Sequence, residues 1–122
     1  MEYKPRNSSG TVRWFSQAGL GILLVVLLSI HLIVNHWAAP HGLLSHTDVV
    51  RYYDVPGIAL MEILFLAVVT VHSLLGLHSI LLDLNLPHSV HTACTWLLVI
   101  LGVAAILYGS RLIWVITTMP TP

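Results

Sequence analysis

Residues 57–83 read GIALMEILFLAVVTVHSLLGLHSILLD, an apolar run with few polar side chains. The run is longer than the ~20 residues that an α-helix needs to cross the ~30 Å hydrocarbon core of a bilayer. One further apolar run precedes it, at about 15–36, and another follows it, at about 91–117. The sequence therefore predicts an all-α membrane protein with three transmembrane helices, an outer loop over 37–56 and a short turn over 83–87.

The composition supports the same class. Hydrophobic residues make up 57% of the chain and charged residues only 8%, whereas a soluble domain carries about 25% charged residues. Five basic residues balance five acidic ones, so no basic surface for nucleic acid is expected. We interpret residues 1–122 as a single membrane domain.

Charge and tryptophan positions orient the predicted helices. Lys4, Arg6 and Arg13 precede the first apolar run, and basic residues favour the cytoplasmic side of a membrane. The four tryptophans lie at the ends of the first and third runs, at positions 14, 37, 96 and 114. We therefore expect a multi-pass protein of the cell inner (cytoplasmic) membrane with its N-terminus inside. A short interfacial helix is predicted over residues 48–53 of the outer loop.

Four small or polar residues share one face of the second predicted helix. Gly76, Ser79 and Asp83 follow His72 by four, seven and eleven positions, so the four lie within about 60° of one another. Asp83 lies roughly 16 Å from His72 along the helix. A histidine in hydrocarbon needs a partner, a water-filled cavity or a metal. His72 is therefore the leading functional candidate.

The residues alone leave two interpretations of His72 open. Haem iron takes an axial nitrogen from one helix and a second from a facing helix, and a nearby glycine lets the flat macrocycle approach the backbone. Alternatively, the imidazole forms a hydrogen bond with a serine or a carbonyl group of a neighbouring helix. The stripe that His72 forms with Gly76 and Asp83 favours haem.

His31 and Arg111 are further candidates at the other membrane depth. His31 lies roughly 25 Å from Trp14 along the first helix, which places it in the outer half of the membrane, whereas His72 lies in the inner half. His31 either binds a second metal centre, or it caps a hydrogen-bond network or touches a haem propionate. Arg111 either pairs with a haem propionate or extends to the lipid headgroups.

Two other features of the spans have simpler interpretations. Gly102, Ala105 and Gly109 form a small-residue face on the third helix, which is typical of helix packing. Glu62, near the outer end of the second helix, is expected either to reach water or to carry protons.

The segment HSLLGLHSILLD, from His72 to Asp83, resembles the second-helix signature of the membrane-anchor (cytochrome b) subunits of succinate dehydrogenase, also called succinate:quinone oxidoreductase. In that signature a glycine follows the histidine by four positions and an aspartate follows the glycine by seven. The three spans, the cytoplasmic N-terminus and the chain length are also similar. The resemblance covers most of the chain, from Trp14 to about Trp114.

The resemblance implies haem b as cofactor, in one or two copies. His72 would be an axial ligand of one haem, and in relatives with two haems His31 would be a ligand of the outer one. Gly76, Ser79 and Arg111 are the other expected haem contacts. Quinone is the expected substrate and is placed near Asp83, with Arg13 and Ser16 as candidate contacts. Leu84 follows Asp83, where many small anchors have a tyrosine that reaches the quinone.

The resemblance also implies partner subunits and indicates which subunit carries out each step of the reaction. A second membrane-anchor subunit would complete the helical bundle and supply the opposite haem ligand, and an iron-sulfur subunit and a flavoprotein subunit would dock on the cytoplasmic face. Succinate would be oxidised in the soluble arm, and electrons would pass through iron-sulfur clusters to quinone. The chain itself would then be a non-catalytic subunit of an oxidoreductase.

Two other functions remain open. One is a haem-free anchor of a quinol:fumarate reductase, in which His72 serves only packing. The other is a non-redox membrane assembly or transport subunit, in which the histidine stripe relays protons or binds a different metal. A reduced-minus-oxidised spectrum addresses the first, and co-purification with flavin and iron-sulfur partners addresses the second.

Overall fold

The computed structural model describes residues 8–38 and 45–120, which form four helices. Three of them are long: α1 (Ser8–Ala38), α3 (Ile58–Asp83) and α4 (His88–Thr117). Each of these is long and apolar enough to cross a membrane. Within the described ranges there is no strand. The prediction of an all-α protein with three spans is therefore confirmed.

The fourth helix, α2 (His46–Tyr53), lies in the predicted outer loop. It begins two residues before the predicted short helix, because Ser45 caps it. The Ser45 hydroxyl accepts a hydrogen bond from the backbone N–H of Asp48, and the Asp48 carboxylate accepts one from the backbone N–H of Ser45. This reciprocal capping box satisfies two backbone donors that a helix start leaves without partners. Residues 39–44 of the loop, and Lys4 and Arg6, lie outside the described residues.

The long helices extend beyond some of the predicted apolar runs. α1 begins at Ser8 instead of about residue 15, and α4 begins at His88 instead of about residue 91, whereas α3 matches its prediction within one residue. The physical reason is that hydropathy marks only the part of a helix that lies in hydrocarbon. A helix can continue past that boundary, because its backbone hydrogen bonds are internal to the segment.

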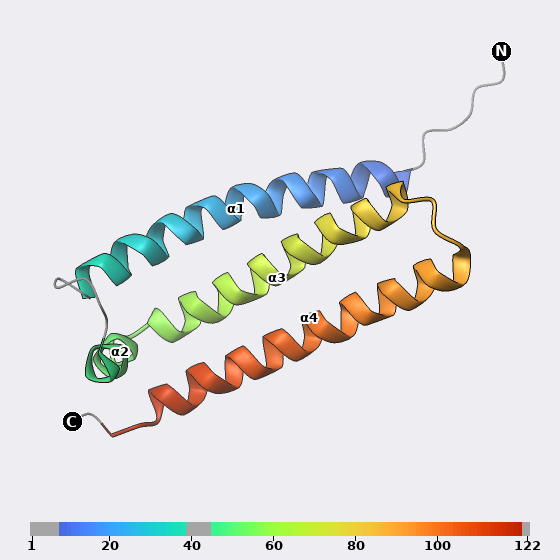
Figure 1. Ribbon diagram of the computed structural model, residues 1–122. Coiled ribbons are helices and arrows are strands. Elements are labelled where there is room, and N and C mark those ends of the chain that lie inside the picture. The colour runs from blue at the N-terminus through green and yellow to red at the C-terminus, as the bar shows by residue number, and fades with distance from the viewer. Residues whose placement is uncertain (1–7, 39–44, 121–122) are drawn as a thin grey trace, which may run out of the picture.

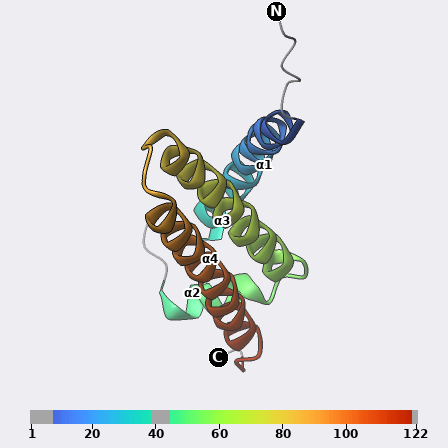
Figure 2. The same cartoon turned by 90° about the vertical axis from the view of Figure 1, so that its right-hand side faces the viewer.

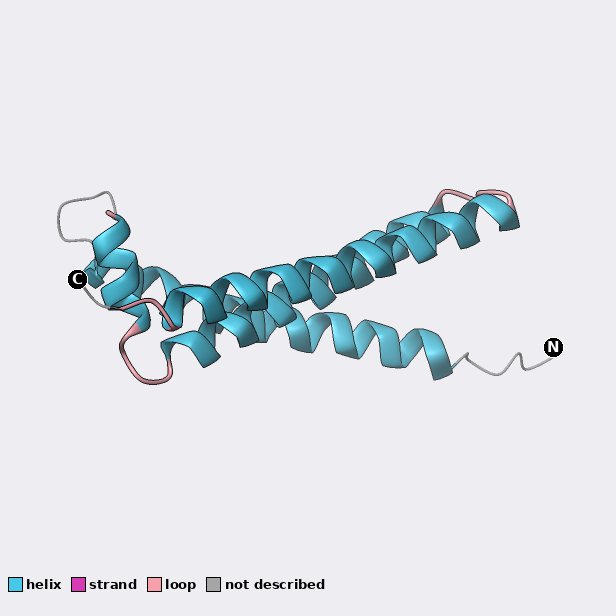
Figure 3. Cartoon of the chain, turned by 90° about the horizontal axis from the view of Figure 1, so that it is seen from below, coloured by secondary structure: helices cyan, strands magenta, loops and turns pink. Residues whose placement is uncertain are grey.

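The three long helices lie side by side with α3 in the middle (Figure 1). α1 and α4 run in one direction and α3 runs in the other. α3 and α4 stay adjacent along their length (Figure 2), whereas α1 diverges from this pair toward the end where the N-terminus lies (Figure 3). The short α2 packs against α3 and α4 at the opposite end. α3 is therefore the element through which the other helices are held together.

Two glycines of α4 allow its close approach to α3. A Cβ atom added to Gly102 would lie 2.4 Å from Leu74 Cδ1, and one added to Gly109 would lie 2.5 Å from Leu66 Cδ2. Both distances are shorter than real carbon contacts, so each leucine occupies the space that the glycine leaves. The predicted packing role of Gly102 and Gly109 is confirmed, while Ala105 on the same predicted face is exposed.

Little apolar surface is buried within this chain. Most large hydrophobic side chains remain exposed, including the four tryptophans, whose exposed fractions range from 63% to 77%. A layer of helices with two uncovered apolar faces is stable only where lipid or another hydrophobic subunit covers them. Among the residues that the structure describes, the few buried hydrophobic side chains are Leu27, Val50, Tyr52, Ile58, Val68 and Ile113.

Replacement of Gly102 by leucine should separate α3 from α4. The added side chain has no room beside Leu74, and overpacking of this kind costs about 1–3 kcal/mol. Thermal unfolding of the chain in detergent micelles would show the loss of stability. Ala104→Leu adds the same side chain at an exposed position of α4 and should leave the stability unchanged. Equal stability of both variants would contradict the packing role of Gly102.

Candidate functional site

The middle of the α1–α3 interface is built from two glycines and two polar side chains. The imidazole of His72 on α3 packs on Gly21 of α1, where a Cβ would lie 3.2 Å from the ring Cε1 atom. One turn away, the amide of Gln17 on α1 packs on Gly76 of α3, where a Cβ would lie 3.2 Å from Gln17 Nε2. Each helix therefore offers a glycine to the polar side chain of the other.

His72 has no hydrogen-bond partner among the residues that the structure describes. Its Nδ1 atom is buried on the side that faces α1, and its Nε2 atom is not buried. A buried imidazole nitrogen without a partner is unusual, because native proteins satisfy most buried polar atoms. The alternative interpretation of His72, a hydrogen bond to a serine or carbonyl of a neighbouring helix, is therefore not realised within the described part of this chain.

The predicted stripe on α3 divides between two surroundings. His72 and Gly76 face α1. The space beside Gly76, which was expected to admit the haem macrocycle, is filled by the side chain of Gln17. Ser79 is exposed and donates a hydrogen bond to the backbone carbonyl of Leu75 at 2.9 Å. Asp83 is exposed at the last residue of α3. The helical face predicted from the sequence thus exists, and α1 covers one half of it.

One candidate quinone contact, Arg13, lies in a hollow where α1 begins and α3 ends. Arg13 and Gln17 of α1 and Ser79 of α3 line a hollow of about 270 Å³, together with Gly10 and Trp14. Ser16 lies on α1 outside this lining and is exposed. The structure therefore brings Arg13 together with Ser79 and leaves Ser16 and Asp83 at the surface of the same end.

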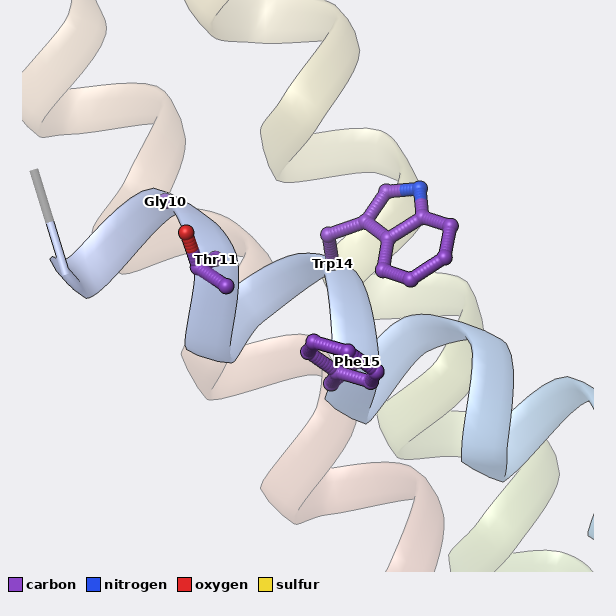
Figure 4. Close-up of a pocket in the computed structure, with 4 residues that line it drawn as sticks. All are labelled: Gly10, Thr11, Trp14 and Phe15. Carbon is purple, nitrogen blue, oxygen red and sulfur yellow. The ribbon is translucent and has the colours of Figure 1, made fainter. Parts of the chain in front are cut away.

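A second hollow, of about 540 Å³, lies along the same segment of α1. It is lined by Gly10, Thr11, Trp14 and Phe15 (Figure 4). The Trp14 and Phe15 rings meet edge to face with their centroids 5.0 Å apart. The described residues of its lining carry no titratable side chain.

The opposite end of the α1–α3 pair holds a polar cluster around Glu62. The Glu62 side chain is only 7% exposed. His31 Nδ1 lies 2.8 Å from Glu62 Oε1 and 2.9 Å from Oε2, and the Tyr52 hydroxyl donates a hydrogen bond to Oε1. The Asn35 amide, which donates to the His31 carbonyl at 2.8 Å, also reaches the Tyr52 hydroxyl at 3.5 Å. Four side chains from α1, α2 and α3 therefore share one network, in which Glu62 and Tyr52 are buried and His31 and Asn35 are half-buried.

This network contradicts one alternative for Glu62, contact with water, because its side chain is buried; the other alternative, that Glu62 carries protons, stays a prediction. The network also realises one alternative for His31, the hydrogen-bond network; iron ligation by His31 stays a prediction. The sequence contained a signal for the pairing of Glu62 with His31, because an ionisable residue inside a span normally pairs with another polar residue at the same depth. His31 and Glu62 both lie in the outer halves of neighbouring spans, but their register is set only by the α1–α3 packing.

Two tyrosines of α2, Tyr52 and Tyr53, lie outside the spans, and the Glu62 carboxylate affects the pKa of both. Burial, together with the hydrogen bond to Glu62, raises the pKa of Tyr52 well above its usual range. Burial, with a smaller effect of the Glu62 charge, also raises the pKa of Tyr53. Both phenols therefore stay protonated at neutral pH, so Tyr52 acts as a hydrogen-bond donor.

Two further polar residues lie apart from these clusters. Arg111 is exposed on α4 and forms no ion pair with any residue in 8–38 or 45–120. His78 of α3 meets His91 of α4 edge to face, with ring centroids 5.6 Å apart, and His91 Nε2 is buried without a partner. His78 also lines an apolar hollow of about 240 Å³ between α3 and α4.

Comparison with known proteins identifies the family of this chain. The model of the family described as succinate dehydrogenase/fumarate reductase transmembrane subunit matches residues 3–110. The chain belongs to this family. It is a hydrophobic membrane anchor of a succinate dehydrogenase, and it therefore associates with the membrane and with other subunits of its complex.

Two relatives of this family carry the same description, succinate dehydrogenase hydrophobic membrane anchor subunit. The one from Thermoplasma acidophilum is 26% identical over 113 residues, which cover 93% of this chain and 92% of the relative. The one from Archaeoglobus fulgidus is 30% identical over 101 residues, which cover 83% and 86%. No solved structure matches the chain.

Replacement of Glu62 by leucine should release α2 from this membrane anchor. His31 and Tyr52 would lose their shared acceptor, and a buried polar group left without a partner costs about 1–3 kcal/mol. Amide hydrogen exchange over residues 46–53 should accelerate as a result. Asp54→Asn removes an exposed carboxylate next to α2 and serves as the control. Unchanged protection of α2 in the Glu62 variant would show that the network does not hold this helix.

Proposed function

We propose that this chain is the haem-ligating anchor of a succinate:quinone oxidoreductase, with His72 as one axial ligand of haem b. The observation that carries the proposal is the His72 imidazole, which lies inside α3 with a buried, unpartnered Nδ1 and an accessible Nε2. A haem iron takes the lone pair of one neutral imidazole nitrogen as its axial ligand. His72 offers such a nitrogen at a depth where an idle polar ring would be costly.

The surroundings of His72 leave a haem one side of the ring. Gln17 occupies the space beside Gly76, and Val71, which precedes His72 on α3, is an exposed apolar side chain, so a porphyrin would lie against the exposed edge of His72. His31, the other histidine expected to bind iron, lies near Glu62, ten residues or roughly 15 Å along α3 from His72. The opposite axial ligand would therefore come from a second membrane-anchor subunit. Bound there, haem b supplies a one-electron carrier.

The exposed surfaces accord with the proposed partners. The second anchor would cover one apolar face of the helix layer and complete a bundle. The iron-sulfur and flavoprotein subunits would dock at the end that holds the N-terminus and the α3–α4 turn, which we assign to the cytoplasmic side of the inner membrane because basic residues precede α1. Succinate oxidation would then take place outside this chain.

Quinone would bind at this same end. The hollow beside Arg13 and Ser79 offers a cationic donor, and the carbonyl oxygens of a quinone only accept hydrogen bonds. The Ser79 hydroxyl would donate only after leaving the Leu75 carbonyl. Asp83 and Ser16 lie at the surface nearby and would contribute to a pocket completed by other subunits. In this arrangement, Arg13 is the residue of this chain best placed to hold the quinone.

A second haem at His31 would have to use its Nε2 atom. The Nδ1 atom is already engaged by Glu62, and a carboxylate bonded to one ring nitrogen commonly supports metal binding at the other. Arg111 lies at the same end of the chain and is free to meet a propionate. Whether the complex holds one or two haems is therefore decided at His31.

Replacement of His72 by alanine should abolish the b-type band of the purified complex, or of its inner haem where two are present. The variant loses the axial ligand, and a reduced-minus-oxidised spectrum measures the result. His36→Ala removes an exposed histidine near the other end of α1 and should leave the spectrum unchanged. An unaltered spectrum in the His72 variant would exclude the ligation. A wild-type complex without any b-type band would favour the haem-free anchor instead.

Replacement of His31 by alanine separates the one-haem complex from the two-haem complex. With one haem, the haem-to-flavin ratio and the spectrum should stay at the wild-type level. With two, the ratio should fall by about half, because only the outer centre depends on His31. A complete loss of haem would contradict the assignment of His72 and His31 to separate depths.

A further inference from the structure

Two buried polar atoms without partners lie in the same interface between α1 and α3. They are Oε1 of Gln17 and Nδ1 of His72. The two atoms are complementary, because an amide oxygen only accepts hydrogen bonds, whereas a protonated imidazole nitrogen donates them. In the part of the chain that the structure describes, the one other buried side-chain atom without a partner is Nε2 of His91, at the α3–α4 contact.

The packing places these two side chains on neighbouring turns. Gln17 precedes Gly21 by one turn on α1, and His72 precedes Gly76 by one turn on α3. Because Gln17 packs on Gly76 and His72 packs on Gly21, the amide and the ring lie about one helical turn apart along the interface, roughly 5 Å at the helical pitch. The glutamine side chain has three rotatable bonds, so a change of rotamer brings its amide toward the ring.

We propose that Gln17 is a positioning residue for His72. In the haem-bound complex, its Oε1 atom accepts a hydrogen bond from the Nδ1–H group of His72. The proposal rests on the proposed function, because it needs His72 as an axial ligand. It satisfies both buried atoms at once, and it also explains why a polar side chain is placed against Gly76 in an otherwise apolar interface.

The hydrogen bond would select the tautomer that iron requires. With the proton held on Nδ1 by Gln17, the lone pair lies on Nε2, the accessible nitrogen of His72. Histidines that bind metals normally donate their other N–H group to a carboxylate, a carbonyl or a water molecule. An amide oxygen in this position makes the imidazole a better electron donor, which favours ferric over ferrous iron and lowers the midpoint potential of the haem.

Gln17→Leu in the intact, purified complex tests this role. Leucine has a similar size but no acceptor, so the haem should bind on the order of ten-fold more weakly, measured as the haem-to-flavin ratio during dilution. The midpoint potential of the remaining haem, measured by redox titration, should become more positive. For a one-electron couple, a ten-fold change in the preference for ferric iron corresponds to about 59 mV.

Two companion variants sharpen the test. Ser29→Ala removes a polar group from α1 whose hydroxyl donates only to the Val25 carbonyl of the same helix, and it should leave the potential unchanged. Gln17→Glu keeps an acceptor oxygen at the same place, so it should retain the haem at a potential at or below the wild-type value. If the leucine variant does not assemble, a Gln17→Glu potential above the wild-type value would overturn the proposal.

The remaining outcomes are distinct. A merely structural role for Gln17 against Gly76 would lower the yield of complex without moving the potential of the assembled haem, and this result would also overturn the proposal. A leucine variant with wild-type haem content and potential would do the same and would leave His72 as the ligand. Absence of a b-type haem from the wild-type complex would instead refute the proposed function on which this inference rests.

Discussion

The packing of α3 against both other long helices is the constraint on which the rest of the structure depends. In hydrocarbon, helices gain little from hiding apolar side chains from one another, so close approach and polar contacts decide which faces meet. α3 meets α4 where Leu66 and Leu74 enter the spaces of Gly109 and Gly102, and it meets α1 through Gly21 and Gly76. These contacts fix the register of both neighbours, and every polar cluster follows from that register.

The polar groups along the α1–α3 interface differ in how well they are satisfied. Around Glu62, the acceptor oxygens and their donors are supplied by α1, α2 and α3, so that cluster is complete within the chain. At His72 and Gln17, the buried atoms have no partners within the described residues. Because buried polar atoms are rarely left alone in a working protein, the second region is where a ligand is expected. The first is better understood as the attachment of α2 to the bundle.

The open arrangement of the helices is consistent with a subunit that packs against other subunits. α1 diverges from α3 and α4 toward the end where the N-terminus lies (Figure 3), and most large apolar side chains are exposed. Membership of the succinate dehydrogenase/fumarate reductase transmembrane subunit family supplies a reason for this, since such an anchor associates with other subunits. The hollow lined by Arg13 and Ser79 lies at the same end.

The sequence by itself determined the three spans, the short α2, and the face of α3 that carries His72, because hydropathy and helical periodicity act within single segments. It also identified Gly102 and Gly109 as packing residues. Only the tertiary structure decided that Glu62 is buried with His31 and Tyr52, that Gln17 fills the space beside Gly76, and that His72 turns its Nδ1 atom toward α1. The reason is that these contacts depend on the register between helices, which periodicity within one helix does not specify.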